Sequence, residues 1–157
     1  MKKILVATDG SPASAAAEAE AIDLCVEHGA ELVVVHCWHA PGEWLGQPYY
    51  QHAVARELAA ARAVLARPLA LAETWSVPVD AELVEGSAAE HILEVAESHA
   101  VDLVVVGARG TNPLERLFVG SVSSAVVRHA AVPVLVVKEG WVARARDASP
   151  GLEAAPA

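Results

Sequence analysis

The stretch that best reveals the architecture is residues 102–127, DLVVVGARGTNPLERLFVGSVSSAVV. Its apolar run Leu103–Val106 is mostly β-branched and continuous rather than alternating, which is typical of a strand buried on both faces of a parallel sheet. Gly107 follows the run directly, Gly110 lies three residues further on, and a helical pattern then begins at Gly120. The stretch therefore predicts a buried strand, a glycine-containing loop and a helix.

The same alternation of apolar runs and helical patterns extends along the rest of the chain. The other predicted strands are Ile4–Ala7, Leu32–His36, Val79–Val84 and Val134–Val137. One of the intervening helices is expected over residues 51–75, where Pro68 should kink or break it. The order β-α-β-α-β-α-β-α-β predicts an α/β fold, an open doubly wound five-stranded parallel sheet with helices on both faces and right-handed crossovers.

Capping residues mark the ends of two other helices. The first should start with Ser11 as its cap and Pro12 in its first turn, and should end at Gly29. Ser87 and Glu90 have the spacing of a capping box at the start of the helix that precedes the 102–127 stretch.

Composition narrows the classes of function. The chain has 157 residues, 54% of them hydrophobic and 20% charged, which favours one globular domain. The net charge of −9 and three lysines argue against a nucleic-acid binder. No apolar run reaches the ~18–20 residues of a membrane span, and residues 1–10 lack the features of a secretory signal. Cys25 and Cys37 form neither a metal-type pair nor a disulfide framework, so we expect a cytoplasmic protein without a membrane partner.

The glycine-containing loop has features of a phosphate site. In a doubly wound sheet, ligands bind beyond the carboxyl ends of the strands, and this loop follows one of those ends. Glycines let backbone N–H groups approach an anion, and a helix beginning at Gly120 adds N–H donors and hydroxyls from Ser121 and Ser123. Neither a Walker motif nor a dinucleotide GxGxxG is present. The alternative is that Gly107 ends a strand, Gly110 makes a turn and Gly120 caps a helix.

The spacing G-x2-G-x9-G-[ST] resembles the signature of the ATP-binding branch of the universal stress protein family. The similarity continues through ILVATDGSPAS, VVVHCW, DLVVVGARG and GSVSSAVVRHAAVPVLVV and covers about residues 2–138. It implies a Rossmann-like sheet of order 3-2-1-4-5 within a domain spanning 1–138. It also implies ATP, or AMP or ADP, across the ends of the first and fourth strands, with Mg²⁺ bound through the phosphates. Residues 139–157 show no periodicity and are expected to form a flexible tail.

The resemblance also assigns roles to individual residues. Ala7 and Asp9 would flank the ribose and adenine, the backbone around Cys37 would read the adenine edge, and the glycine loop with the following helix start would surround the phosphates. The nucleotide-binding residues implied in this way are Ala7, Thr8, Asp9, Cys37, Val106, Gly107, Ala108, Arg109, Gly110, Gly120, Ser121, Val122 and Ser123.

Three of these residues have alternative or additional roles. Arg109 would place a guanidinium on the phosphates, or would be a solvated loop residue or a partner of Glu115. Asp9 would face the ligand or cap the first helix, although Ser11 is better placed as the cap. The sulfur of Cys37 would make the site sensitive to oxidation, whereas Cys25 is expected to be a core thiol.

The loop over residues 38–50 carries Trp and Tyr side chains and is longer than most strand–helix connections. It suggests an aromatic flap over the adenine or a partner surface. A metal site built from His36, His39 and His52 is the weaker alternative, because these residues straddle a strand end and a loop.

The final strand is expected to be an edge strand that pairs with its copy in a homodimer, through Val132 to Lys138. The predicted function is an ATP-binding stress-response module that regulates a protein partner the sequence does not name. The alternatives are a member of the family that acts through its surface without nucleotide, or a weak ATP hydrolase. A dedicated ATPase or kinase is disfavoured because no lysine lies near the loop and Asp9 is the one plausible base.

Overall fold

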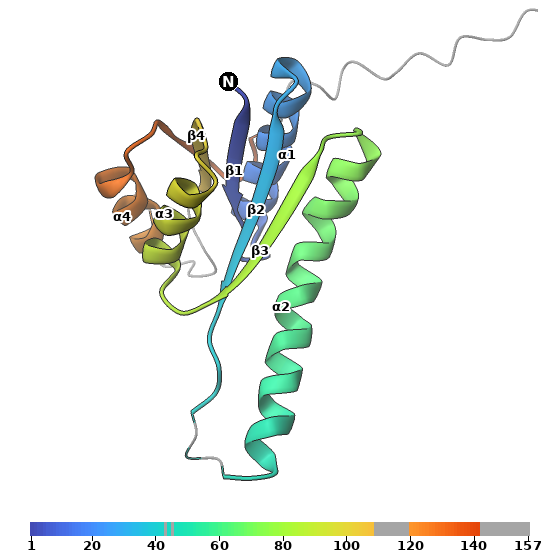
Figure 1. Cartoon of the computed structure of the whole chain (residues 1–157), viewed down its shortest axis with the longest axis vertical. Helices are drawn as coiled ribbons and strands as arrows, with labels where there is room; N and C mark the ends of the chain where they lie inside the picture. Colours follow the sequence, from blue (N-terminus) through green and yellow to red (C-terminus); the bar gives the residue numbers. More distant parts are fainter. Residues whose placement is uncertain (43, 45, 109–119, 142–157) are drawn as a thin grey trace, which may run out of the picture.

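The computed structural model describes residues 1–42, 44, 46–108 and 120–141. Strands and helices alternate along the chain as the sequence predicts (Figure 1). The elements are β1 (Lys3–Ala7), α1 (Pro12–His28), β2 (Glu31–Trp38), α2 (Tyr49–Thr74), β3 (Val79–Glu85), α3 (Ala88–Ser98), β4 (Leu103–Gly107), α4 (Ser121–His129) and β5 (Val134–Val137).

The strands form one parallel sheet of order β3-β2-β1-β4-β5, which confirms the predicted topology. The order reverses direction at β1, whose neighbours are β2 on one side and β4 on the other. Val6 is in register with Val34 of β2 and Val105 of β4. In a sheet of this kind, ligands are expected to bind beyond the carboxyl ends of β1 and β4.

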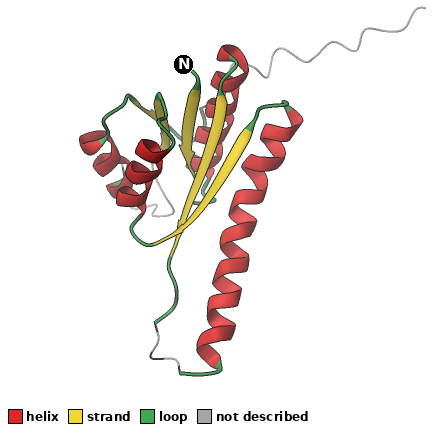
Figure 2. Ribbon diagram, in the orientation of Figure 1, coloured by secondary structure: helices red, strands yellow, loops and turns green. Residues whose placement is uncertain are grey.

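Helices cover both faces of the sheet (Figure 2). Side chains of β1 alternate between the two resulting cores: Ile4 and Val6 pack with residues of α1 and α2, whereas Leu5 packs with residues of α3 and α4. Burial on both faces explains why the strands read as unbroken apolar runs. None of the helices in the described ranges is both long and apolar enough to cross a bilayer.

The ends of α1 form as predicted, whereas the capping box of α3 does not. Ser11 Oγ accepts the N–H of Ser14 at 3.1 Å, and Gly29 ends the helix in the left-handed region at φ 61°. Ser87 occupies the N-cap position of α3 but makes no capping bond through its side chain. Both Ser87 and Glu90 are exposed, where water competes for the same donors.

Helix α2 runs through Pro68, so the expected break is wrong. Leu65, Pro68 and Ala72 are buried on the face of α2 that packs on β2 and β3. Burial of this apolar face offsets the backbone hydrogen bond that the proline ring removes. The first half of α2 extends past the carboxyl ends of the strands (Figure 1).

The chain beyond β5 returns to α1. The indole Nε1 of Trp141 donates to Glu20 Oε2 at 2.6 Å, and the backbone N–H of Trp141 donates to Lys138 O at 3.1 Å. The first residues of the predicted tail thus have defined contacts, and residues 142–157 of that tail lie outside the described part of the chain.

Shortening Leu65 tests the burial that holds α2 on the sheet. Leu65 is 7% exposed, so Leu65→Ala should lower the free energy of unfolding by about 3 kcal/mol and Tm by about 6–12 °C. Arg62→Ala, on the exposed side of the same helix, should change the free energy of unfolding by less than about 0.5 kcal/mol. Thermal and urea unfolding measure both variants, and equal losses of stability in the two would contradict this assignment of the buried face.

Candidate functional site

The residues expected at the nucleotide site come from two neighbouring strands. Because Val6 lies opposite Val105, Ala7 and Thr8 continue beside the last residues of β4. Val106 itself is buried in the core that faces α3 and α4, so its side chain supports the strand rather than lining the edge. The β1–α1 loop and the end of β4 are the two walls of the site.

Gly107 brings these two walls together. A Cβ on Gly107 would lie 2.8 Å from the carbonyl carbon of Ala13 and 3.0 Å from the backbone N of Ser14. Both atoms belong to the first turn of α1, and real Cβ atoms do not approach backbone so closely. The glycine here is required by contact between strand and helix, and this contact holds the β1–α1 loop against the end of β4.

A hydrogen bond closes the base of the glycine-containing loop. Gly120 N donates to Ala108 O at 2.8 Å, and Ala108 N donates to Val137 O at 2.7 Å. The start of α4 is thereby fixed beside the end of β4. Arg109 and Gly110 lie outside the described residues, as does Glu115, so the predictions for Arg109 stay predictions.

The N-terminus of α4 begins beside this base. Gly120 is the N-cap residue, and no side chain forms a capping bond to the first turn within the described part of the chain. The hydroxyl of Ser123 is buried and donates to Gly120 O at 3.0 Å, whereas Ser121 and Val122 are exposed. The N–H groups of the first turn and the positive end of the helix dipole make this end suited to an anion.

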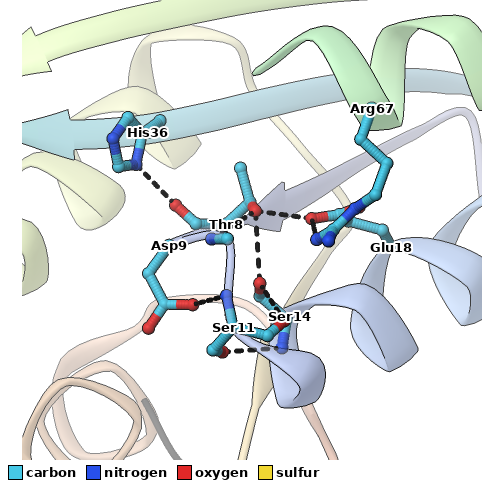
Figure 3. Close-up of polar contacts among 8 residues, drawn as sticks. Thr8, Asp9, Ser11, Ser14, Glu18, His36 and Arg67 are labelled. Carbon is cyan, nitrogen blue, oxygen red and sulfur yellow. Dashed lines mark hydrogen bonds and ion pairs between the residues drawn. The ribbon is translucent and has the colours of Figure 1, made fainter. Parts of the chain in front are cut away.

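Asp9 braces the β1–α1 loop and still exposes its carboxylate. Its Oδ1 accepts the N–H of Ser11 at 2.9 Å, whereas Ser11 itself caps α1 (Figure 3). Among the described residues, none donates a hydrogen bond to Oδ2 of Asp9, and the residue is exposed. The carboxylate is therefore held in place by one oxygen and open at the other.

Thr8 is buried, and its side chain points away from this edge. Its hydroxyl donates to Glu18 of α1, and its carbonyl accepts from Nδ1 of His36 at 2.8 Å (Figure 3). Arg67 of α2 in turn binds Glu18. The sequence reasoning missed Glu18 and Arg67, although a charged residue on the alanine-rich inner face of α1 is a signal for a buried polar contact.

Cys37 lies on β2, opposite Val84 of β3, at the same carboxyl edge. Burial raises the pKa of the Cys37 thiol to about 11 and that of Cys25 to about 12. Both thiols are therefore protonated at neutral pH, which argues against the predicted oxidation sensitivity of Cys37, because the thiolate is the reactive form.

The histidines do not converge. His36 is bound to the Thr8 carbonyl, and both His39 and His52 are exposed. Across residues 1–42, 44, 46–108 and 120–141, no three His, Cys, Asp or Glu side chains are placed to hold a metal ion. Trp44 in the 38–50 loop is 86% exposed, and the role of this loop as an adenine flap stays a prediction.

The sequence profile of the universal stress protein family matches residues 1–138. The chain belongs to the universal stress protein family. A relative from Thermus aquaticus, named universal stress protein in QAH/OAS sulfhydrylase 3′ region, is 41% identical over 137 residues, covering 87% of this chain and 98% of the relative.

Solved universal stress proteins share the fold. UspA from Lactobacillus plantarum superposes with a TM-score of 0.76 at 30% identity, over 87% of this chain and 97% of that one. A universal stress protein in complex with cAMP superposes with a TM-score of 0.64 at 24% identity, over 87% of this chain and 95% of that one. The universal stress protein from Archaeoglobus fulgidus in complex with dAMP superposes with a TM-score of 0.64 at 20% identity, over 88% of this chain and 98% of that one.

The raised pKa of Cys37 predicts slow alkylation of this universal stress protein. At pH 8, iodoacetamide should modify the native protein at least about tenfold slower than a free cysteine of pKa about 8.5, because the loss of thiolate outweighs its higher intrinsic nucleophilicity. The rate should rise about tenfold per pH unit up to about pH 11 while the fold persists. Intact-mass spectrometry follows the reaction, with urea-unfolded protein as the control. Fast modification of folded protein at pH 8 would show an activated thiol.

Proposed function

We propose that this universal stress protein binds ATP, or AMP or ADP, at the carboxyl edge between β1 and β4 and acts as a nucleotide-dependent module of the stress response. The observation that carries the proposal is the convergence of two complementary groups at this edge. The carboxylate of Asp9 lies on one loop, and α4 begins at Gly120 on the other; among the described residues, no side chain caps this helix start or donates to Oδ2 of Asp9. The Ala108–Gly120 hydrogen bond and the contact of Gly107 with α1 hold the two together.

These groups fit the parts of a nucleotide. A carboxylate accepts hydrogen bonds from ribose hydroxyls, and free N–H groups at a helix start donate to phosphate oxygens. Ser121 adds an exposed hydroxyl beside those N–H groups. The backbone around Cys37 is the proposed contact for adenine. Mg²⁺ would be bound through the phosphates, as this ion usually retains water and few protein ligands.

The comparisons support an adenine nucleotide in particular. The two neighbours solved with cAMP and with dAMP have the same fold, and both ligands contain adenine, a sugar and a phosphate. Their low identity to this chain makes the local chemistry of Asp9 and the α4 start the stronger argument.

We favour a binding module over a dedicated hydrolase. Phosphoryl transfer requires positioned cations and a group that orients the nucleophile. Asp9 is already bound to the Ser11 N–H, which suits a ligand-holding role better than proton abstraction. Regulation would follow if a protein partner reads a surface that differs between the nucleotide-bound and free states.

Thermal unfolding with and without Mg-ATP tests nucleotide binding. At about 100 times its Kd, ATP should stabilise the protein by about 2.7 kcal/mol and raise Tm by about 5–10 °C. Ser121→Asp should abolish this shift, because a carboxylate in the first turn of α4 is favourable for the helix but repels phosphate. Ser121→Asn, which adds a side chain of the same shape without the charge, should keep most of the shift.

The shifts in Tm with different nucleotides distinguish an adenine-nucleotide-binding protein from the alternative functions. An equal shift with GTP would mean that the site reads phosphate without adenine. No shift with any nucleotide would favour a protein that acts through its surface alone. Steady release of phosphate from ATP, lost in Ser121→Asp together with the shift, would identify a weak hydrolase.

We also propose a homodimer through the β5 edge, from Val132 to Lys138. β5 has β4 as its partner on one side, and the neighbouring α4 exposes Val122 at 37% and Val127 at 51%. An uncovered apolar edge favours association with a second copy. Light scattering at micromolar concentration should give twice the chain mass, and Val127→Asp should shift the protein toward monomer. A wild-type monomer would contradict this arrangement.

A further inference from the structure

Thr8, the residue before Asp9, is held from several elements at once. Its N–H donates to Val35 O at 2.9 Å, and its carbonyl accepts from Nδ1 of His36, so β2 fixes the backbone on both sides of the residue. The hydroxyl of Thr8 accepts the N–H of Gly10 at 3.3 Å and donates to Glu18. The loop that carries Asp9 therefore starts from a residue with little freedom to move.

The contact between Thr8 and Glu18 depends on an ion pair with α2. The side chain of Glu18 is 1% exposed, and its two oxygens accept from Nε and Nη2 of Arg67 at 2.8 and 2.7 Å. A carboxylate this deeply buried requires a cation and full hydrogen bonding to remain charged. The hydrogen bond to Glu18 raises the pKa of Arg67, and the charges of Glu18 and Asp9 add to this effect.

Stability alone does not account for this arrangement. The neighbours of Glu18 along α1 include Ala17, Ala21 and Ile22, all buried, and an apolar side chain would be the less costly occupant of such a position. The charged pair instead presents an acceptor to the hydroxyl of Thr8 (Figure 3). Hydrogen bonds with a charged partner are stronger than neutral ones, which suits a role in orientation.

We propose that Glu18 and Arg67 are positioning residues of the nucleotide site: the pair orients Thr8, and through it the Asp9 carboxylate, and so couples helix α2 to nucleotide binding. The inference rests on the proposed nucleotide-binding function. It adds that α2, which contributes no predicted ligand contact, communicates with the site. Such coupling is reciprocal, so a nucleotide at Asp9 must also favour the position of α2 in which Arg67 binds Glu18.

Calorimetric titration with Mg-ATP tests the positioning role through Thr8→Val, Thr8→Ser and Glu18→Gln. Thr8→Val keeps the shape of the residue but removes the hydroxyl, and we expect Kd to rise about tenfold, or about 1.4 kcal/mol. Thr8→Ser restores the hydroxyl and should bind within about twofold of the wild type. Glu18→Gln removes the charge that receives Arg67 and should weaken binding at least as much as Thr8→Val.

Two control variants separate positioning from loss of stability. Val101→Ala removes buried apolar volume from the other core, at the amino end of β4 and away from α2, and should leave Kd unchanged below its Tm. Lys3→Gln breaks the 3.5 Å pair between Lys3 and Glu31, which lies at the amino ends of β1 and β2, away from the site, and should also leave Kd unchanged. If Val101→Ala weakens binding as much as Thr8→Val, the contacts among Thr8, Glu18 and Arg67 have no specific role in binding.

Hydrogen exchange with and without Mg-ATP tests the coupling between the site and α2 directly. Mg-ATP should slow amide exchange in α2 around Arg67, and Thr8→Val should lose this protection even at saturating ATP. Binding without any change in α2 would overturn the coupling and leave the proposed function intact. Failure of the wild type to bind any adenine nucleotide in the titration would overturn both.

Discussion

The contact of Gly107 with the first turn of α1 is the constraint on which the candidate site depends. Because the strand end carries no Cβ, the backbone of α1 at Ala13 and Ser14 settles directly onto it. The β1–α1 loop then lies beside the end of β4, and the hydrogen bond from Gly120 N to Ala108 O places the start of α4 at the same point. A larger residue at position 107 would separate these groups even if each loop kept its own conformation.

Electrostatics explains why the proposed nucleotide site would need backbone donors. The net charge of −9 opposes an approaching polyphosphate, but charges beyond about 8 Å are largely screened at physiological salt. Short-range donors would therefore decide the affinity of the proposed site for a nucleotide, and α4 supplies N–H groups whose direction is set by the helix itself. The cation of Arg67 is committed elsewhere, because Nε and Nη2 are bound to Glu18.

The parts of the structure predicted correctly from sequence are those in which local pattern and tertiary environment agree. The β-branched runs, the Ser11 cap and the Gly29 terminus each report a local preference that the fold retains. The break at Pro68 failed because the packing of α2 on the sheet outweighs one missing hydrogen bond. The capping box at Ser87 failed because exposed side chains lose little by remaining hydrated.

The position of the candidate site in the sheet could be predicted from the sequence, whereas the side-chain contacts that support it could not. Its backbone elements follow strands whose ends can be located in the sequence, so the pattern of residues was enough to place Asp9, Ala108 and Gly120 at one edge. The pairing of Glu18 with Arg67 could not be predicted, because the two residues are 49 positions apart and only the packing of α2 on α1 brings them together.

A buried charge of this kind limits which loop conformations are compatible with the fold. Any movement of Thr8 away from Glu18 leaves the carboxylate short of one donor, and a buried acceptor without its donor is costly. The loop that carries Asp9 is consequently ordered in the absence of ligand, so a nucleotide at the proposed site would lose less of its binding free energy to the ordering of this loop.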